Sequence, residues 1–320
     1  MIRLVGAELT RLRSRRLSIV AALVVLAAVA LFQLAIHSEV APSAAAQARG
    51  QQAYAQAQKD WQDSHAANVA ECVQEGTSQE ECESYDPAPS PQDFSAEPTA
   101  FADVAGFGLT TAAYLAMFAS FLVAASFIGA EYSTGSLANW LTFVPQRLKV
   151  FGSKAIAVLL GSALLGTVAV FATLGLTAAQ VAHHGGPLVG AGRLAAGSGR
   201  AVVLVAVAGL VGYVLALVTR HTVAAIVVPL GYGLVRTVLV AFTADEDAPL
   251  AWLPPYLPEL NLKAFLEHGT SYTQYREVPG GDYTDIEKHL SFAHSGLYWL
   301  TLLVVAVVVG GLVFRRRDVT

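Results

Sequence analysis

Six long apolar runs constrain the fold of this chain more than any other feature of its sequence. Each run reaches the roughly 18 residues that a helix needs to cross the hydrocarbon core of a bilayer. The runs comprise residues 17–36, 109–130, 155–181, 201–218, 222–242 and 297–314. Apolar residues in these runs are continuous and do not alternate with polar ones, which favours helices over barrel strands. The sequence therefore predicts an all-α polytopic membrane protein with six transmembrane helices.

Composition supports this class of protein. Of the 320 residues, 54% are apolar and only 14% are charged, whereas a soluble domain carries roughly 25% charged residues. This balance excludes an ordinary soluble domain and an intrinsically disordered chain. The basic clusters lie only beside apolar runs, so we expect no nucleic-acid partner. The localisation that we expect is a bacterial plasma membrane.

The first apolar run follows five arginines and is about 20 residues long, longer than the roughly 7–15 residues of a signal-peptide core. We therefore expect a first transmembrane helix, with cleavage in the alanine-rich stretch after residue 41 as the alternative.

The distribution of lysines and arginines predicts the orientation. Twelve of the 20 fall on the side of the N-terminus when the six runs alternate direction. The positive-inside rule then places both termini, the loop 131–154 and the tail 315–320 in the cytoplasm. Segments 37–108, 182–200 and 243–296 become extracytoplasmic. Only residues 219–221 separate the fourth and fifth runs, and a central Arg220 would be costly in one long helix, so we predict a tight helical hairpin there.

The two long extracytoplasmic segments differ in character. Residues 44–58 are rich in alanine and glutamine, which favours a helix, and residues 86–98 are acidic and proline-rich, which favours an extended linker. Aromatic residues in 243–296 are typical of an interfacial belt, although a lid over a substrate exit is an alternative. Cys72 and Cys82 lie in the first segment, where an oxidising compartment favours a disulfide. Metal binding is the alternative, but the spacing matches no zinc site.

The loop 131–154 contains the spacing of a short amphipathic helix. Its apolar stripe consists of Leu137, Trp140, Leu141 and Val144, at positions i, i+3, i+4 and i+7. Gly135 permits a sharp bend before the helix, Ser136 could cap it, and Pro145 would end it. Asn139 and Thr142 would face the cytosol. Such a helix either connects two spans at the membrane surface or docks into a groove on a cytosolic partner.

This loop resembles the cytoplasmic segment of ABC-2 type transporter permeases. The matching positions are Glu131, Gly135-Ser136-Leu137, Pro145-Gln146-Arg147 and Lys154. Residues 1–16, with an apolar face of Ile2, Val5, Leu9 and Leu12, resemble the amphipathic interface helix that precedes the first span in that family. Six spans with both termini inside are also the arrangement of the family.

The resemblance implies a non-catalytic permease subunit of an exporter, paired with a second permease copy. It also implies an ABC ATPase subunit that carries ATP and Mg²⁺. A phosphate-binding loop needs a Gly-Lys pair, and this chain has none, so we expect neither a cofactor nor catalytic residues here. The residues expected to couple the spans to the ATPase are Glu131, Gly135, Ser136, Leu137, Asn139, Trp140, Pro145, Arg147 and Lys154.

Arg236 is the one full charge within a predicted span core. It could line a pathway for an anionic substrate or lipid headgroup. Alternatively, it could snorkel to lipid phosphate or pair with an extracytoplasmic carboxylate such as Asp245. Two other functions stay open at this point: an ATPase-independent secondary transporter or channel, and a membrane-anchored protein that binds a partner through its outer loops.

Overall fold

The computed structural model describes residues 1–41, 44–95, 99–277 and 283–316. It divides the chain into two compact units. The first unit comprises residues 1–33, 105–176 and 190–320, and the second comprises residues 34–104 and 177–189.

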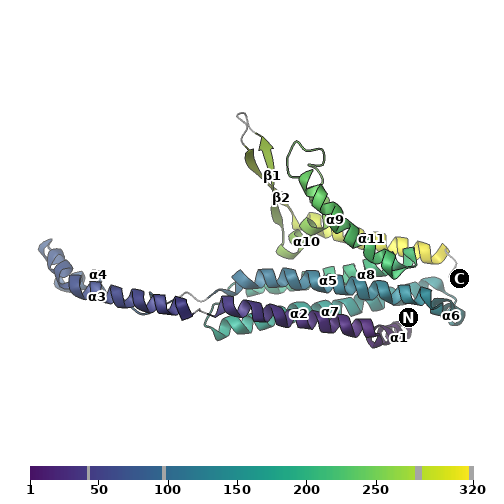
Figure 1. Ribbon diagram of the computed structural model, residues 1–320, viewed down its shortest axis with the longest axis horizontal. Helices are drawn as coiled ribbons and strands as arrows, with labels where there is room; N and C mark the ends of the chain where they lie inside the picture. The colour runs from purple at the N-terminus through teal and green to yellow at the C-terminus, as the bar shows by residue number, and fades with distance from the viewer. Residues whose placement is uncertain (42–43, 96–98, 278–282, 317–320) are drawn as a thin grey trace. The chain divides into compact units, whose positions relative to one another are not determined.

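The described residues form a predominantly helical fold with one β-hairpin (Figure 1). The helices are α1 (Ile2–Ser14), α2 (Arg16–Val40), α3 (Ala44–Gln74), α4 (Gln79–Tyr85), α5 (Phe101–Ser133), α6 (Ser136–Phe143), α7 (Arg147–His183), α8 (Ala191–Thr219), α9 (Thr222–Ala241), α10 (Pro258–Glu267) and α11 (Phe292–Arg316). A 3₁₀ turn, η1 (Pro254–Tyr256), precedes α10, and strands β1 (Thr270–Glu277) and β2 (Tyr283–Leu290) form the hairpin. Six of these helices, α2, α5, α7, α8, α9 and α11, are long and apolar enough to cross a membrane. The six predicted spans and the predominantly helical fold class are therefore confirmed.

Several spans extend beyond the predicted limits. Helix α5 begins at Phe101 instead of residue 109, α7 begins at Arg147 instead of residue 155, and α8 begins at Ala191 instead of residue 201. Hydropathy marks only the part of a helix that matches the hydrocarbon thickness. Lysine, arginine and alanine are good helix formers, so the helices continue into the flanking polar sequence. Much of the predicted loop 131–154 is consequently helical.

Within the first unit, α1, α6 and the C-terminal end of α11 lie at the same end of the helix bundle (Figure 1). The predicted break between the fourth and fifth spans is also present. Helix α8 ends at Thr219, and Arg220 adopts a left-handed conformation with φ 59°. The Arg220 guanidinium lies over the Tyr132 ring, 5.9 Å from its centroid. This places the α8–α9 turn beside the end of α5. Residues 317–320 of the predicted tail lie outside the described residues.

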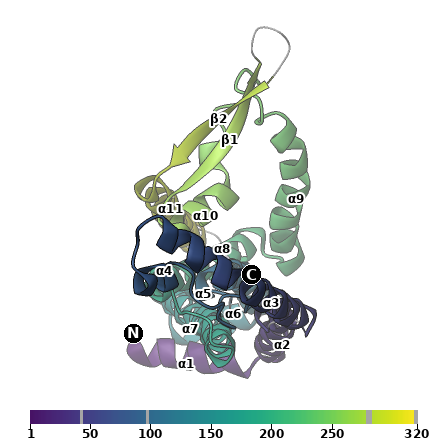
Figure 2. The ribbon, with the colours of Figure 1, turned by 90° about the vertical axis from the view of Figure 1, so that its left-hand side faces the viewer.

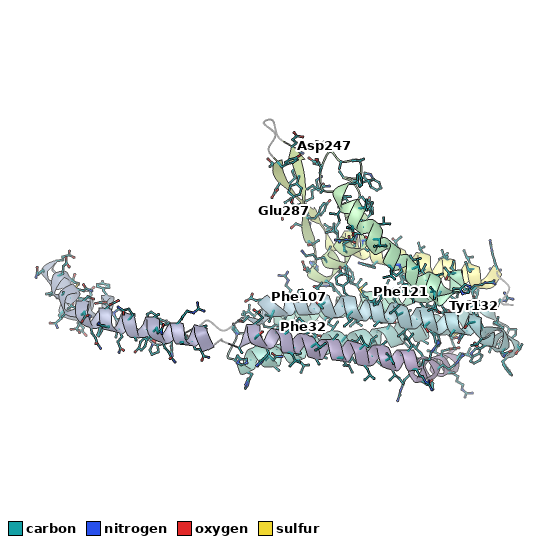
Figure 3. All side chains as sticks on the ribbon, in the orientation of Figure 1. Phe32, Phe107, Phe121, Tyr132, Asp247 and Glu287 are labelled. Carbon is teal, nitrogen blue, oxygen red and sulfur yellow. A yellow bond between two sulfur atoms is a disulfide. The ribbon has the colours of Figure 1, made fainter. Side chains whose placement is uncertain are left out.

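The core of the first unit lies around α8, whose Tyr213 is fully buried. A close approach of two helices builds this core. A Cβ atom at Gly212 of α8 would lie 2.5 Å from the carbonyl oxygen of Phe121 of α5 and 3.0 Å from its Cα atom. Only glycine permits this separation. Nearer the other end of α5, Phe107 lies beside Phe32 of α2, with ring centroids 6.1 Å apart (Figure 3).

The second unit contains α3 and α4. The helix predicted for residues 44–58 is present and runs on to Gln74. A disulfide joins Cys72 to Cys82, with a Cα–Cα distance of 5.9 Å, which confirms the predicted pairing. Residues 86–95 of the predicted linker form no helix, and residues 96–98 lie outside the described residues.

Residues 243–290 contain structure that the sequence analysis did not predict. Helix α10 packs against the hairpin and against α8 and α11 (Figure 2). Buried Gln274 holds the hairpin against the loop that follows α9. Its Nε2 donates to the carbonyl oxygens of Thr243 at 2.8 Å and Ala251 at 2.9 Å. The β1 and β2 sequences carry many charged residues, and only Thr270, Gln274 and Leu290 are buried. Alternating hydrophobicity is therefore too weak to mark these strands.

Candidate functional site

Four charged side chains form a cluster, called here the ion cluster, at the end of the first unit that carries α6. Its residues are Glu8, Arg11, Glu131 and Lys154. Lys154 Nζ donates to Glu131 Oε1 at 2.8 Å and to Glu8 Oε1 and Oε2 at 2.9 and 3.0 Å. Lys154 has no exposed surface, and Glu8 and Glu131 are 2% and 4% exposed. The ion cluster thus joins α1, α5 and α7 at one buried point.

Arg11 balances the charge of the ion cluster. Its guanidinium nitrogens lie 2.9 Å from Glu131 Oε1 and 3.3 Å from Glu8 Oε2. Two carboxylates therefore face two cations. Burying a charge is costly unless it is paired and hydrogen-bonded, so each member of the ion cluster depends on the others to stay in place.

Two aromatic rings connect the ion cluster to neighbouring elements. The ring of Phe127 in α5 lies under Lys154 Nζ, with 5.0 Å from nitrogen to centroid, and under the Arg15 guanidinium at 5.6 Å. The Arg11 guanidinium lies 5.6 Å from the centroid of Trp140 in α6. Cations at this distance from a ring face are attracted to it. Arg11 therefore links the ion cluster directly to the short helix α6.

Helix α6 is the short helix that the loop spacing predicts, but its N-cap differs from the prediction. Gly135, with φ +66°, occupies the N-cap position, and no side chain caps the helix. Ser136 is the first helical residue, and its Oγ accepts from Thr134 Oγ1 at 3.2 Å. The left-handed conformation of Gly135 turns the chain sharply after α5. The bend assigned to Gly135 is confirmed, whereas the capping role of Ser136 is wrong.

The two faces of α6 have different environments. Leu137 is 1% exposed and belongs to the core, and Leu141 and Val144 are half-buried against that core. Trp140 is half-buried as well. Asn139 and Thr142 are exposed on the opposite side, as the spacing predicts. Phe143, at the C-terminal end of α6, is 82% exposed. Helix α6 therefore presents a solvent face that ends in a large apolar side chain.

The predicted coupling residues divide into two groups. Glu131 and Lys154 are buried in the ion cluster, so they position the helices and do not reach the surface. Asn139 and Pro145 are exposed, and Arg147 is half-buried at the start of α7.

Three residues of this region, Glu8, Arg11 and Phe143, were missed by the sequence analysis. One signal for Glu8 was available, because it is the one acidic residue among the arginines that precede the first apolar run.

Arg236, near the C-terminal end of α9, belongs to a separate polar contact. Its Nε donates to Glu259 Oε1 at 2.5 Å, and the Tyr232 hydroxyl donates to Glu259 Oε2 at 2.6 Å. The carboxylate partner is therefore Glu259 of α10, and the suggested partner Asp245 is wrong. Asp245 accepts instead from the backbone N–H of Asp247 at 2.9 Å. Burial alone would raise the pKa of Glu259, but the hydrogen bonds from Tyr232 and Arg236 hold it below its usual value.

Among the described residues, no cluster of three or more His, Cys, Asp or Glu side chains could hold a metal ion.

No curated protein sequence matches this chain significantly. The sequence does match the family described as ABC-2 family transporter protein over residues 8–319. The match begins at Glu8 of the ion cluster and takes in all six spans and α6. The chain therefore belongs to the ABC-2 family of transporter proteins.

Proposed function

We propose that this chain is the permease subunit of an ABC-2 type ABC transporter and that a separate ATPase subunit docks on the solvent face of α6. Asn139, Thr142 and Phe143 supply two polar side chains and one exposed apolar side chain on that face. An apolar residue that fills a pocket on a partner is a common anchor of protein interfaces.

The ion cluster is the observation that carries this proposal. It links α1, α5 and α7, and Arg11 extends the link to Trp140 of α6. A displacement of α6 therefore acts on three helices together, because a close-packed core transmits strain. A simple connector between two spans would need no such buried network, and a buried ion pair costs desolvation that an apolar contact avoids.

In the proposed cycle, ATP and Mg²⁺ bind to the partner subunits, whose closure pushes on α6. The spans then move as a group and open a pathway, and export is the direction implied by the family resemblance. Both termini and α6 would face the cytoplasm of a bacterial cell. The ion cluster takes no part in chemistry in this scheme and holds α6 against the spans.

A second permease copy completes the proposed transporter. Helix α9 is the least buried of the six spans, and Val227, Leu234 and Val238 on its surface are all more than half exposed. We propose that part of this surface packs against the second copy, with lipid covering the remainder.

Co-purification from native membranes in a mild detergent tests this function. The expected result is an ATP-hydrolysing subunit at equal stoichiometry, which Phe143→Asp removes. Tyr283→Asp, an equally drastic change at an exposed position of β2, is the matched control and should retain the ATPase. A preparation without any ATPase, from membranes in which the neighbouring genes are expressed, would overturn the proposal in favour of a secondary transporter.

A further inference from the structure

The first unit contains a cavity of about 610 Å³ between α1, α2, α5 and α7. This volume lies within the range of about 300–1,000 Å³ that is typical of ligand sites. The cavity is distinct from the ion cluster and from α6, because none of Glu8, Arg11, Glu131 and Lys154 lines it. The proposed coupling to an ATPase makes no use of it.

Most of the cavity wall is apolar. Leu23 and Leu26 of α2 face Leu164, Leu165 and Val168 of α7 across it. Leu23, Leu26 and Leu164 are also exposed on the surface of the unit, so the cavity is continuous with the surface that a bilayer would cover. A wall of this kind suits a hydrocarbon chain and would hold water poorly.

Two serine hydroxyls in the wall lack a hydrogen-bond partner among the described residues. They are Ser18 Oγ of α2 and Ser120 Oγ of α5. Ser120 is only 2% exposed. Serine hydroxyls in helices commonly bond to the carbonyl of the preceding turn, and a buried hydroxyl without any partner is costly. The two serines therefore point to a ligand that brings acceptor oxygens into an otherwise apolar cavity.

The two serines lie at different levels of the bundle. Val25 of α2 packs with Ala116 and Ala119 of α5. Ser120 follows Ala119, so it lies near the level of Val25, whereas Ser18 lies about two turns before Val25, toward α1. The Ser18 hydroxyl is thus nearer to α1 than Leu23 and Leu26 are, and the Ser120 hydroxyl lies among the apolar residues of the wall.

One charged residue lines the cavity, and it is cationic. Arg13 of α1 is exposed and forms no ion pair within the described part of the chain. The order from the surface inward is therefore a guanidinium, then the Ser18 hydroxyl, then an apolar wall that contains the Ser120 hydroxyl. In a phospholipid, a phosphate, an ester carbonyl and an acyl chain follow one another in the same order.

We propose that the cavity binds one anionic membrane phospholipid. Arg13 pairs with the phosphate, Ser18 donates to an ester carbonyl, and an acyl chain fills the space between α2 and α7. The lipid would wedge between α1 and the spans. By the positive-inside rule it would come from the cytoplasmic leaflet, where clustered basic residues attract anionic lipid.

The test uses the full-length protein, purified in mild detergent and depleted of lipid. Native mass spectrometry and thermal unfolding are followed while phosphatidylglycerol or phosphatidylcholine is added. We expect one phosphatidylglycerol to remain bound and to raise the unfolding temperature. Ala22→Trp fills the cavity and should reduce lipid retention at least tenfold. Ala27→Trp, on an exposed position of the same helix that does not line the cavity, is the control and should leave retention unchanged.

A second variant keeps the proposal testable if Ala22→Trp does not fold. Arg13→Gln should lower the preference for phosphatidylglycerol over phosphatidylcholine about fivefold, the effect of one basic residue near anionic lipid. Arg3→Gln, at an exposed position of α1 that does not line the cavity, should preserve the preference. Equal retention by Ala22→Trp and Ala27→Trp would overturn the site. An unchanged preference in Arg13→Gln would overturn the assignment of an anionic lipid.

Discussion

Lys154 Nζ lies 2.8 Å from Glu131 Oε1 in the interior of the first unit. The family resemblance places both residues among those expected to couple the spans to a partner ATPase. Their pairing shows that they lie beneath the surface that such a partner would touch. Their contribution to coupling is therefore expected to be positional, through α1, α5 and α7, and the surface of α6 would make the contact.

Removal of Lys154 should destabilise the protein strongly. Lys154→Met keeps a side chain of similar size but removes the cation that pairs with both Glu8 and Glu131, so that Arg11 is left to pair with the two carboxylates. Loss of one partner from a buried ion pair costs about 3–5 kcal/mol. We expect lower yield and a lower unfolding temperature in detergent, measured by size-exclusion chromatography after heating.

A matched control and a rescue distinguish charge pairing from packing. Lys149→Met, at an exposed position of α7, should leave the unfolding temperature unchanged. The triple variant Glu8→Gln, Glu131→Gln, Lys154→Met removes the uncompensated charges and should recover most of the lost stability. A triple variant no more stable than Lys154→Met alone would contradict the charge-pairing account.

A substitution at Gly135 should disconnect α6 without unfolding the spans. Gly135 has φ +66°, whereas proline is restricted to a φ near −65°. Gly135→Pro should therefore displace α6, abolish transport and abolish stimulation of the proposed ATPase, at normal expression. Arg147→Glu, at the start of α7, should have the same effect. Gly185→Pro places the same restriction at another glycine of positive φ, +76°, and should preserve coupling. Normal transport by both Gly135→Pro and Arg147→Glu would argue against α6 as the coupling element.

The disulfide offers a direct test of the predicted orientation. Cys72 and Cys82 are the two cysteines of the chain. A membrane-impermeant maleimide added to intact cells should label neither of them until an impermeant reductant is added, after which both should react. Closure of this short loop stabilises the pairing of α3 and α4 by about 2.8 kcal/mol in the chain-entropy model, so reduction should also speed proteolysis near Gly76. Labelling that requires cell lysis would place the segment in the cytoplasm and reverse the topology.

The contact between α9 and α10 should depend on pH. The folded-state pKa of Glu259 lies below its usual value, so the folded protein keeps this carboxylate ionised at a pH where the unfolded chain begins to take up a proton. Its contribution to stability is therefore complete at neutral pH and is lost as the pH falls below about 4.3. Unfolding temperatures measured between pH 7 and pH 3.5 should decline at the acid end. Glu259→Gln should weaken that decline, whereas exposed Glu267→Gln should retain it. Identical profiles for the two variants would contradict the pairing with Arg236.

Much of the membrane architecture could be predicted from the sequence. A continuous apolar run in a bilayer must form a helix, because the helix satisfies all its backbone hydrogen bonds internally. The break at Arg220 was predictable because a charge at the centre of one long span is costly. The periodicity of Leu137, Trp140, Leu141 and Val144 likewise predicted α6 and its buried face.

The features that sequence reasoning missed depend on contacts between distant segments. Glu8 and Lys154 are 146 residues apart, and nothing local to either residue indicates the other. The pairing of Arg236 with Glu259 depends on α10, and the sequence of α10 has no strong hydrophobic periodicity that would predict a helix. Phe143 was missed because its exposure becomes informative only once the buried face of α6 is known.

Site-specific photo-crosslinking from α6 tests the central claim most directly. A photoreactive amino acid at position 143, on the exposed end of α6, should join this chain to the proposed ATPase subunit in native membranes. The yield should rise or fall when ATP is trapped on the complex. The same probe at position 283 of β2 should give no such product. A crosslink to the ATPase from position 283 and none from positions 139, 142 or 143 would contradict the account.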